Sequence, residues 1–236
     1  MNSRYTYLLI DFLTIIFPLL LSFDKKVAFH RQWRYLWVGL LGTGVFFLVW
    51  DALFTHQGVW SFNDAYILGI KFFGLPIEEW LFFLAVPYSC VFIYECLLVY
   101  FPFRQRKDWG WQLMLPVSAL LVLTAFLFSY KAYTFTTFSF CGFSILLLYT
   151  FRRRFPSFNA AAFFTCYAIS IVPFFIVNGI LTALPVVQYD DTENLGIRMY
   201  TIPFEDTFYG MLLMLGNVLG MEWRRGRRIN TSQPSS

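Results

Sequence analysis

The sequence has few charged residues, and this shortage excludes a water-soluble globular protein. Asp, Glu, Lys and Arg make up 14% of the 236 residues, whereas hydrophobic residues make up 58%. A soluble domain carries about 25% charged residues, which cover its surface in water. The hydrophobic residues also come in runs of about 20, the length that crosses the hydrocarbon core of a bilayer. We therefore expect an integral membrane protein whose partner is the lipid bilayer.

Cysteine and histidine are also scarce, and neither follows the spacing of a metal site. The four cysteines all lie in hydrophobic runs without a C-x-x-C pair, and the two histidines stand alone. Such cysteines usually serve as small core residues. The sequence also lacks G-x-G-x-x-G, the glycine pattern that binds dinucleotides. We therefore expect no metal, no disulfide framework and no bound cofactor.

The hydrophobic runs predict an all-α integral membrane fold with about seven transmembrane helices. The first run lacks the small-residue cleavage site of a signal peptide, so we expect a retained helix there. The seven runs are Tyr5–Ser22, Arg34–Phe54, Ile77–Phe101, Gln112–Tyr130, Thr134–Phe151, Asn159–Leu184 and Phe204–Glu222.

The basic residues predict how these helices are oriented. Most of the 18 basic residues follow the first, third, fifth and seventh runs, which places them on one side of the membrane. By the positive-inside rule that side is cytoplasmic. We expect a multi-pass protein of the cytoplasmic membrane with its N-terminus outside and its C-terminus inside. Since topology accounts for the net charge of +4, no nucleic-acid partner is needed.

The sequence also contains an internal repeat. Residues 51–92 align without a gap on residues 178–219, a constant shift of 127 residues. In this frame the PIEE motif at 76–79 falls on the PFED motif at 203–206. Chance poorly explains proline and carboxylates that coincide in one frame, so the two halves are expected to share one architecture.

The repeat predicts how the chain is divided. We expect a first three-helix repeat at 1–103, a connector helix at 104–131, a second three-helix repeat at 132–223 and a basic polar tail at 224–236. The connector gives both repeats the same orientation in the membrane, which makes the repeat parallel. The two motifs can then face one shared site across a pseudo-two-fold axis normal to the bilayer.

The paired acidic motifs are the candidate functional residues. One motif alone is explained by structure, because proline and glutamate favour the first turn of a helix. Four carboxylates at the membrane edge of two equivalent helices favour a function. Helical spacing places Phe82 one turn below Glu78, and Tyr209 one turn below Glu205. A protonated carboxyl among aromatic rings suits protonation of an alkene, since ring faces stabilise a cation. Burial favours a retained proton and the helix N-terminus favours the anion, and the sequence leaves both open.

These residues resemble a known enzyme family. Asp51, Trp60, the stretch GLPIEEWLFF at 74–83 and the later PFED at 203–206 resemble the membrane lycopene β-cyclases. That family occurs as two small subunits in some bacteria and as one fused chain in archaea and fungi, and this chain is similar to the fused form. The resemblance implies an intramolecular lyase, an isomerase of carotenoid biosynthesis. It would convert the ψ-ends of lycopene into β-ionone rings, giving γ-carotene or β-carotene, by acid catalysis without net redox change.

The resemblance also implies roles for individual residues. Glu78 and Glu205 are expected to be the acid and base, with Glu79 and Asp206 as their partners. The expected substrate-binding residues are Asp51, Trp60, Phe82, Asn178 and Tyr209. The expected partners are the carotenoid substrate and the lipid bilayer, and association with neighbouring enzymes of the carotenoid pathway is left open.

Other functions fit parts of the pattern. Parallel repeats and intramembrane carboxylates also occur in transporters. However, the carboxylates here cluster at one edge, and Asp11 and Glu95 are the two that fall deep in a run. A retinal protein would need a lysine in the seventh run, which has none. Another carotenoid-modifying enzyme, such as a hydratase or a cyclase of one end, remains an alternative.

Overall fold

The computed structural model describes residues 4–231 and the side chains of residues 4–226. Seven α-helices account for most of this part, and each coincides with one predicted hydrophobic run. They are α1 (Thr6–Leu21), α2 (Trp33–Gln57), α3 (Ile77–Tyr100), α4 (Gly110–Leu127), α5 (Ala132–Thr150), α6 (Ala160–Ala183) and α7 (Glu205–Thr231). Three short 3₁₀ helices join them: η1 (Phe29–Gln32), η2 (Phe103–Gln105) and η3 (Arg152–Arg154). The expected all-α fold is confirmed. The end of the predicted tail, residues 232–236, lies outside the described part.

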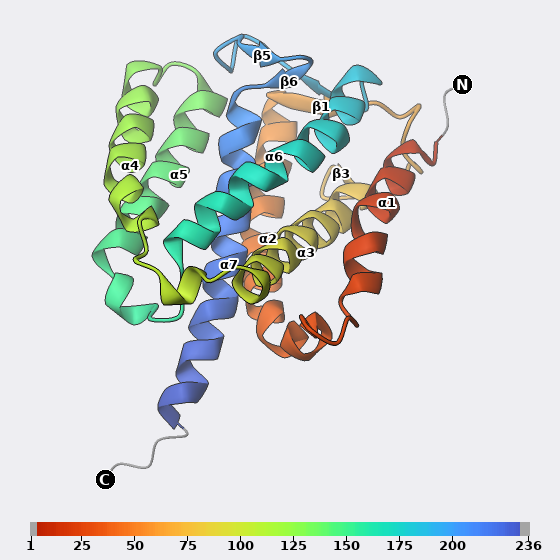
Figure 1. Ribbon diagram of the computed structural model, residues 1–236. Coiled ribbons are helices and arrows are strands. Elements are labelled where there is room, and N and C mark those ends of the chain that lie inside the picture. The colour runs from red at the N-terminus through yellow and green to blue at the C-terminus, as the bar shows by residue number, and fades with distance from the viewer. Residues whose placement is uncertain (1–3, 232–236) are drawn as a thin grey trace.

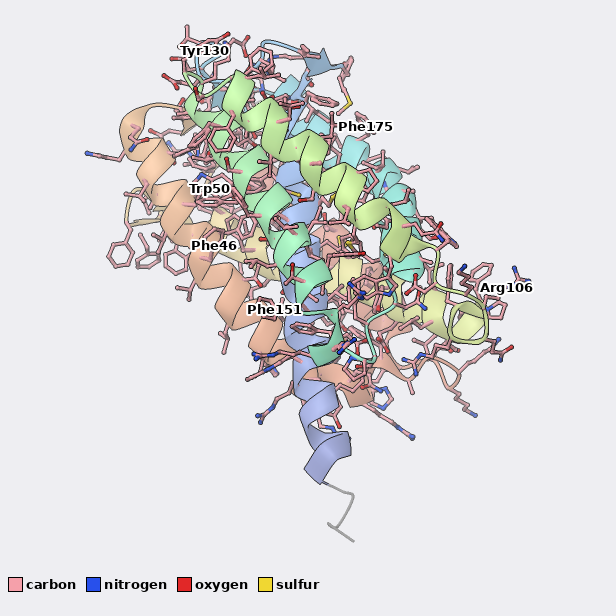
Figure 2. All side chains as sticks on the ribbon, turned by 90° about the vertical axis from the view of Figure 1, so that its left-hand side faces the viewer. Phe46, Trp50, Arg106, Tyr130, Phe151 and Phe175 are labelled. Carbon is pink, nitrogen blue, oxygen red and sulfur yellow. The ribbon has the colours of Figure 1, made fainter. Side chains whose placement is uncertain are left out.

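The helices have the length and surface of a membrane protein. The five helices α2 to α6 are long and apolar enough to span a bilayer, whereas α1 is apolar but has 16 residues. Large apolar side chains cover the outside of the bundle, among them Phe17, Leu120 and Val172. Nitrogen-tipped side chains gather at the end where Phe151 lies, opposite Tyr130 (Figure 2). The protein is therefore an integral membrane protein, as predicted.

The two halves interlock. Within the first half α1 packs on α3, and within the second half α5 packs on α7 (Figure 1). The middle helix of each half packs across the boundary, because α2 lies on α7 and α6 lies on α3. Helix α4 packs mainly against α5, at the edge of the bundle. Residues from both halves therefore meet at the centre.

Six short strands lie among the described residues, and those labelled in Figure 1 lie toward one end of the bundle. Two hairpins lie at equivalent places in the repeat and lead directly into α3 and α7. A third sheet joins the halves. The strands are β1 (Trp60–Phe62), β2 (Lys71–Phe72), β3 (Leu75–Pro76), β4 (Val187–Tyr189), β5 (Arg198–Met199) and β6 (Ile202–Pro203).

The pairing of β1 with β4 locates the pseudo-two-fold axis. Ser61 pairs with Gln188, its own repeat mate under the shift of 127, and Trp60 pairs with Tyr189. The same shift relates Phe62 to Tyr189 and Trp60 to Val187. It therefore exchanges the outer pair Trp60–Tyr189 with the outer pair Phe62–Val187. The antiparallel ladder is therefore symmetric about its central pair. The internal repeat is confirmed, and its axis passes through this sheet.

The two helix contacts that cross the boundary, α2 with α7 and α3 with α6, differ in how closely the helices approach each other. Helices α2 and α7 approach through glycine, since a Cβ on Gly39 would lie 2.5 Å from the carbonyl oxygen of Asn217. The repeat mates of this pair are Cys166 on α6 and Cys90 on α3. There the Cys166 thiol donates to the Cys90 carbonyl over 3.4 Å. The contact between α3 and α6 is thus built from larger side chains.

Candidate active site

A small pocket lies beneath the β1–β4 sheet, where the two halves meet. It has a volume of about 70 Å³, and helices α2, α3 and α7 each supply one carboxyl group to its wall. These groups belong to Asp51, Glu79 and Asp206, and all three residues are buried. Three carboxyl groups from separate helices therefore converge on one cavity.

A tyrosine hydroxyl holds the second carboxylate of each motif. Tyr7 on α1 donates to Glu79 over 2.5 Å, and Tyr133 on α5 donates to Asp206 over 2.5 Å. Tyr189 of β4 adds a second donor to Asp206 at 2.9 Å. The two halves thus build the same tyrosine–carboxyl contact, with one further donor in the second half.

The matching tyrosines are related by a shift of 126 residues, one less than the shift elsewhere. Their backbones confirm the equivalence. The amide of Tyr7 donates to the carbonyl of Tyr66, and the amide of Tyr133 donates to that of Glu193. Since Tyr66 and Glu193 are 127 residues apart, the first half has one residue fewer than the second between this tyrosine and Asp51. This deletion hides the tyrosine pair from a gap-free alignment.

Asp51 links Glu79, the other pocket carboxyl of the first half, to α7 of the second half. Tyr209 on α7 donates to its carboxyl over 2.6 Å, and the carboxyl groups of Asp51 and Glu79 hydrogen-bond to each other. Asn178, the repeat mate of Asp51, lines the same pocket and donates to the carbonyl of Phe174. The site is therefore symmetric in position and unequal in chemistry.

Glu78 and Glu205 lie outside the pocket lining and are completely buried. Glu78 accepts the backbone amide of Leu68 over 2.7 Å, and Glu205 accepts that of Leu195 over 2.7 Å. Glu205 also accepts the hydroxyl of Thr134 at 2.6 Å. Each glutamate thus ties the preceding loop to the start of its helix.

Aromatic rings form the rest of the pocket wall. Trp60 lies with its ring centre 5.1 Å from that of Tyr133 and 6.3 Å from that of Tyr209. Phe82 lines the pocket from α3 and contacts the ring of Tyr7. The pocket therefore combines carboxyl groups with the faces and edges of rings. Among the residues that the structure describes, no group of three His, Cys, Asp or Glu is arranged to hold a metal ion.

The structure brings together seven of the nine residues expected at the site and adds others. The seven are Asp51, Trp60, Glu79, Phe82, Asn178, Asp206 and Tyr209. Tyr7, Tyr133 and Tyr189 were not predicted from the sequence. A search for the repeat that allowed a one-residue gap would have paired the first two.

Charged groups outside the membrane also follow the repeat. Lys71 pairs with Asp64 at 2.7 Å, and Arg198 pairs with Asp191 at the equivalent place. Partial burial raises the pKa of Asp191, but hydrogen bonds from Arg198 and Asn194 outweigh it and lower the pKa below its ordinary value. Burial and the Asp206 charge raise the pKa of Tyr189 well above its ordinary value, so its hydroxyl stays a donor.

Glu95, one of the two carboxylates that lie deep in the helices, fits a structural role better than a transport path. Glu95 forms an ion pair with Arg225 at 3.0 Å, and Glu222 pairs with the same guanidinium at 2.8 Å. This cluster joins α3 to α7 at the end far from the pocket. Asp11 is buried one turn below Tyr7, and its carboxyl oxygens have no hydrogen-bond partner among the described residues.

A family model described as lycopene cyclase matches residues 4–97 and 130–224. The two matched segments correspond to the two halves of the repeat, and the gap between them contains α4. No curated protein and no solved structure matches this chain.

Proposed function

Because the chain belongs to the lycopene cyclase family, we propose that it is a lycopene β-cyclase that converts ψ-ends into β-ionone rings. The observation that carries the proposal is the meeting of Asp51, Glu79 and Asp206 in one aromatic-lined pocket. Cyclisation of an alkene end requires an acid, a site that stabilises a carbocation and a base. The pocket offers a candidate for each.

The Asp51–Glu79 pair is the proposed acid. A carboxylate only accepts hydrogen bonds, so two carboxyl groups bonded to each other hold a proton between them. The proton adds to C2 of the terminal double bond, and the cation forms at C1. Tyr7 and Tyr209 each donate to one member of the pair and fix its orientation. The acid is thereby positioned from both halves.

Ring closure follows from the position of the cation. The electrons of the C5=C6 double bond attack C1 and form the C1–C6 bond, which moves the cation to C5. Rings such as Trp60 and Phe82 stabilise a cation by roughly 0.5–2 kcal/mol each. The carboxylate of Asp206, which is buried, adds electrostatic stabilisation.

Asp206 is the proposed base. Two tyrosine hydroxyls donate to it, which favours its ionised form. It accepts the proton that leaves C6, and the electrons of that C–H bond form the new C5=C6 double bond. The acid pair has then lost one proton and Asp206 has gained one. Exchange of protons before the next turnover restores both, with no net consumption.

Glu78 and Glu205 receive a positioning role in this proposal. Both were expected to be the acid and base from the family resemblance. Their loop contacts, and their place outside the pocket lining, favour Glu79 and Asp206 for those roles instead. By holding the loops against α3 and α7, the two glutamates would keep the neighbouring carboxyls aimed at the pocket.

Incubation of the purified protein in lipid vesicles with unlabelled lycopene in D₂O buffer tests the reaction. A cyclase yields γ-carotene or β-carotene with one deuterium for each ring formed, since the added proton exchanges with solvent. A hydratase would add water to the product. Unchanged lycopene, beside a wild-type protein shown to be inserted and folded, would exclude both reactions.

A further inference from the structure

A wide apolar groove runs along the outside of the bundle between α1 and α6. It has a volume of about 380 Å³, and side chains of α1, α3, α6 and α7 line it. Its outer rim consists of Leu13, Phe17, Ile176 and Ile180, which are among the exposed apolar residues. Since this surface faces lipid in a membrane protein, the groove opens sideways into the hydrocarbon region.

The groove leads into the carboxyl pocket. Four residues line both cavities: Val86, Phe174, Asn178 and Gly210. Gly210 contributes no side chain to the junction, where a Cβ would fill the gap to the ring of Phe174 by a contact of 3.7 Å. An elongated apolar molecule in the groove would therefore present its end to Glu79 and Asp206.

The pseudo-equivalent place between α2 and α5 is filled. The shift of 127 residues relates Val177 to Trp50, Gly210 to Phe83 and Pro173 to Phe46. Larger aromatic side chains thus replace small ones at each of these positions.

The rings at this place pack on one another. The ring centre of Trp50 lies 5.1 Å from that of Phe140 on α5, and Phe46 lies 5.4 Å from the same ring. Phe83 packs on Phe47 at 5.7 Å. Phe46 and Trp50 lie along α2 beside α5 (Figure 2). These rings, Phe46, Trp50, Phe83 and Phe140, form an aromatic plug between α2 and α5, at the place equivalent to the groove between α1 and α6.

We propose that the groove between α1 and α6 binds the extended polyene chain of the substrate and is its lateral entrance, while the aromatic plug closes the other side. The proposal rests on the proposed function and assigns the occupant of a site beside it. The carboxyl pocket is small, about 70 Å³, so it accommodates an end and leaves the chain in the groove. One entrance admits one end at a time, so a second ring requires the molecule to leave and return reversed.

Val177→Trp tests the entrance by placing the residue of the plugged half in the open one. Val172→Trp is the matched control, since Val172 lies on the same helix, is exposed and does not line the groove. Carotenoid retained by each detergent-purified protein is measured by absorbance, and the cyclised pigments of the host by chromatography. We expect Val177→Trp to lower both by roughly tenfold or more, as overpacking of a fitted cavity does, and Val172→Trp to change neither.

Blocking the groove after folding removes any ambiguity from misfolding. Because Cys90 itself lines the groove, Val177→Cys is made in a Cys90→Ala background, folded first and then alkylated with a bulky maleimide, beside the Cys90→Ala protein and Val172→Cys in the same background. Loss of lycopene binding specific to alkylated Val177→Cys supports the proposal. Unchanged binding in a fully alkylated sample overturns it.

The outcomes separate this proposal from the reaction itself. If wild-type protein retains lycopene without cyclising it, and the Val177 variants lose it, the groove stands and the proposed reaction fails. If cyclisation proceeds equally in all variants, the reaction stands and the entrance is wrong. If mass spectrometry finds phospholipid in the groove and no polyene in any sample, the groove is a lipid site and the proposal is overturned.

Discussion

Removal of the Tyr7 hydroxyl should impair the proposed acid without disturbing the fold. Tyr7→Phe keeps the ring, which packs edge-on against Phe82, and removes the donor that lies 2.5 Å from Glu79. The carboxyl of Glu79 would then keep Asp51 as its hydrogen-bond partner but lose the contact that orients it from α1. Turnover should fall more than protein yield or thermal stability.

The size of the loss follows from the hydrogen bond. A hydrogen bond to a charged group contributes about 1.5–3 kcal/mol, which corresponds to roughly 10- to 150-fold in rate if it is fully expressed in the transition state. Tyr133→Phe should cost less, about tenfold or below, because Asp206 keeps its hydrogen bond from Tyr189. The double variant Tyr133→Phe/Tyr189→Phe should lose as much as Tyr7→Phe. We therefore expect Tyr7→Phe to lower the rate more than Tyr133→Phe does, and the double variant to lower it about as much as Tyr7→Phe.

Initial rates of β-carotene formation in lycopene-loaded proteoliposomes provide the assay. Tyr200→Phe is the matched control, since Tyr200 is 82% exposed and its repeat mate, Phe73, is already a phenylalanine. The pH dependence of the rate should change in Tyr7→Phe and remain as in wild type for Tyr200→Phe. A folded Tyr7→Phe protein with a wild-type rate would refute the role assigned to the Tyr7 hydroxyl, which is to orient the acid.

Two further predictions concern stability. Gly39→Ala should lower the midpoint of thermal unfolding in detergent, because its Cβ meets backbone of α7 and overpacking costs about 1–3 kcal/mol, whereas Gly42→Ala on the same helix should leave it unchanged. An equal effect of both changes would disprove the close helix contact. Since Asp191 has a lowered pKa in the folded state, its pairing with Arg198 stabilises the loop above about pH 4 and is lost as the pH falls further. Asp191→Asn should therefore be less stable than wild type at pH 6, and the difference should shrink progressively as the pH falls below about 4, the ordinary value; a difference that stays constant with pH would contradict this.

Hydrophobicity alone predicted the helices well. The run Ile77–Phe101 coincides with α3 (Ile77–Tyr100), and the run Asn159–Leu184 with α6 (Ala160–Ala183). Lipid demands a continuous apolar helix, so the sequence signal is strong. Helix α7 extends past the predicted end at Glu222, because its basic last turns remain helical outside the apolar segment.

The short strands were not predicted. Strands of two or three residues carry no periodic pattern, and β1 pairs with a strand more than a hundred residues away. The gap-free repeat did locate the equivalent loops, although it could not show that they form hairpins.

The repeat predicted the shared site, but not which residue of each motif faces it. Glu78 and Glu79 are adjacent, so a small rotation of α3 decides which one lines the pocket. The rotation depends on the hydrogen bond that the loop amide of Leu68 donates to the Glu78 carboxylate. Contacts between a side chain and a distant backbone have no sequence signature. Tyr7 was missed for a different reason, the one-residue deletion between the halves.

We propose that Glu79 and Asp206 carry the chemistry while Glu78 and Glu205 hold the loops. Turnover of lycopene by purified, folded Glu79→Gln, Asp206→Asn, Glu78→Gln and Glu205→Gln tests it most directly. We predict that the first two lose activity by roughly 10²- to 10⁴-fold, as removal of a general acid or base does, at little cost in stability. The last two should retain measurable turnover and unfold at lower temperature. Abolished turnover in a stable Glu78→Gln protein, together with an active Glu79→Gln protein, would contradict the account.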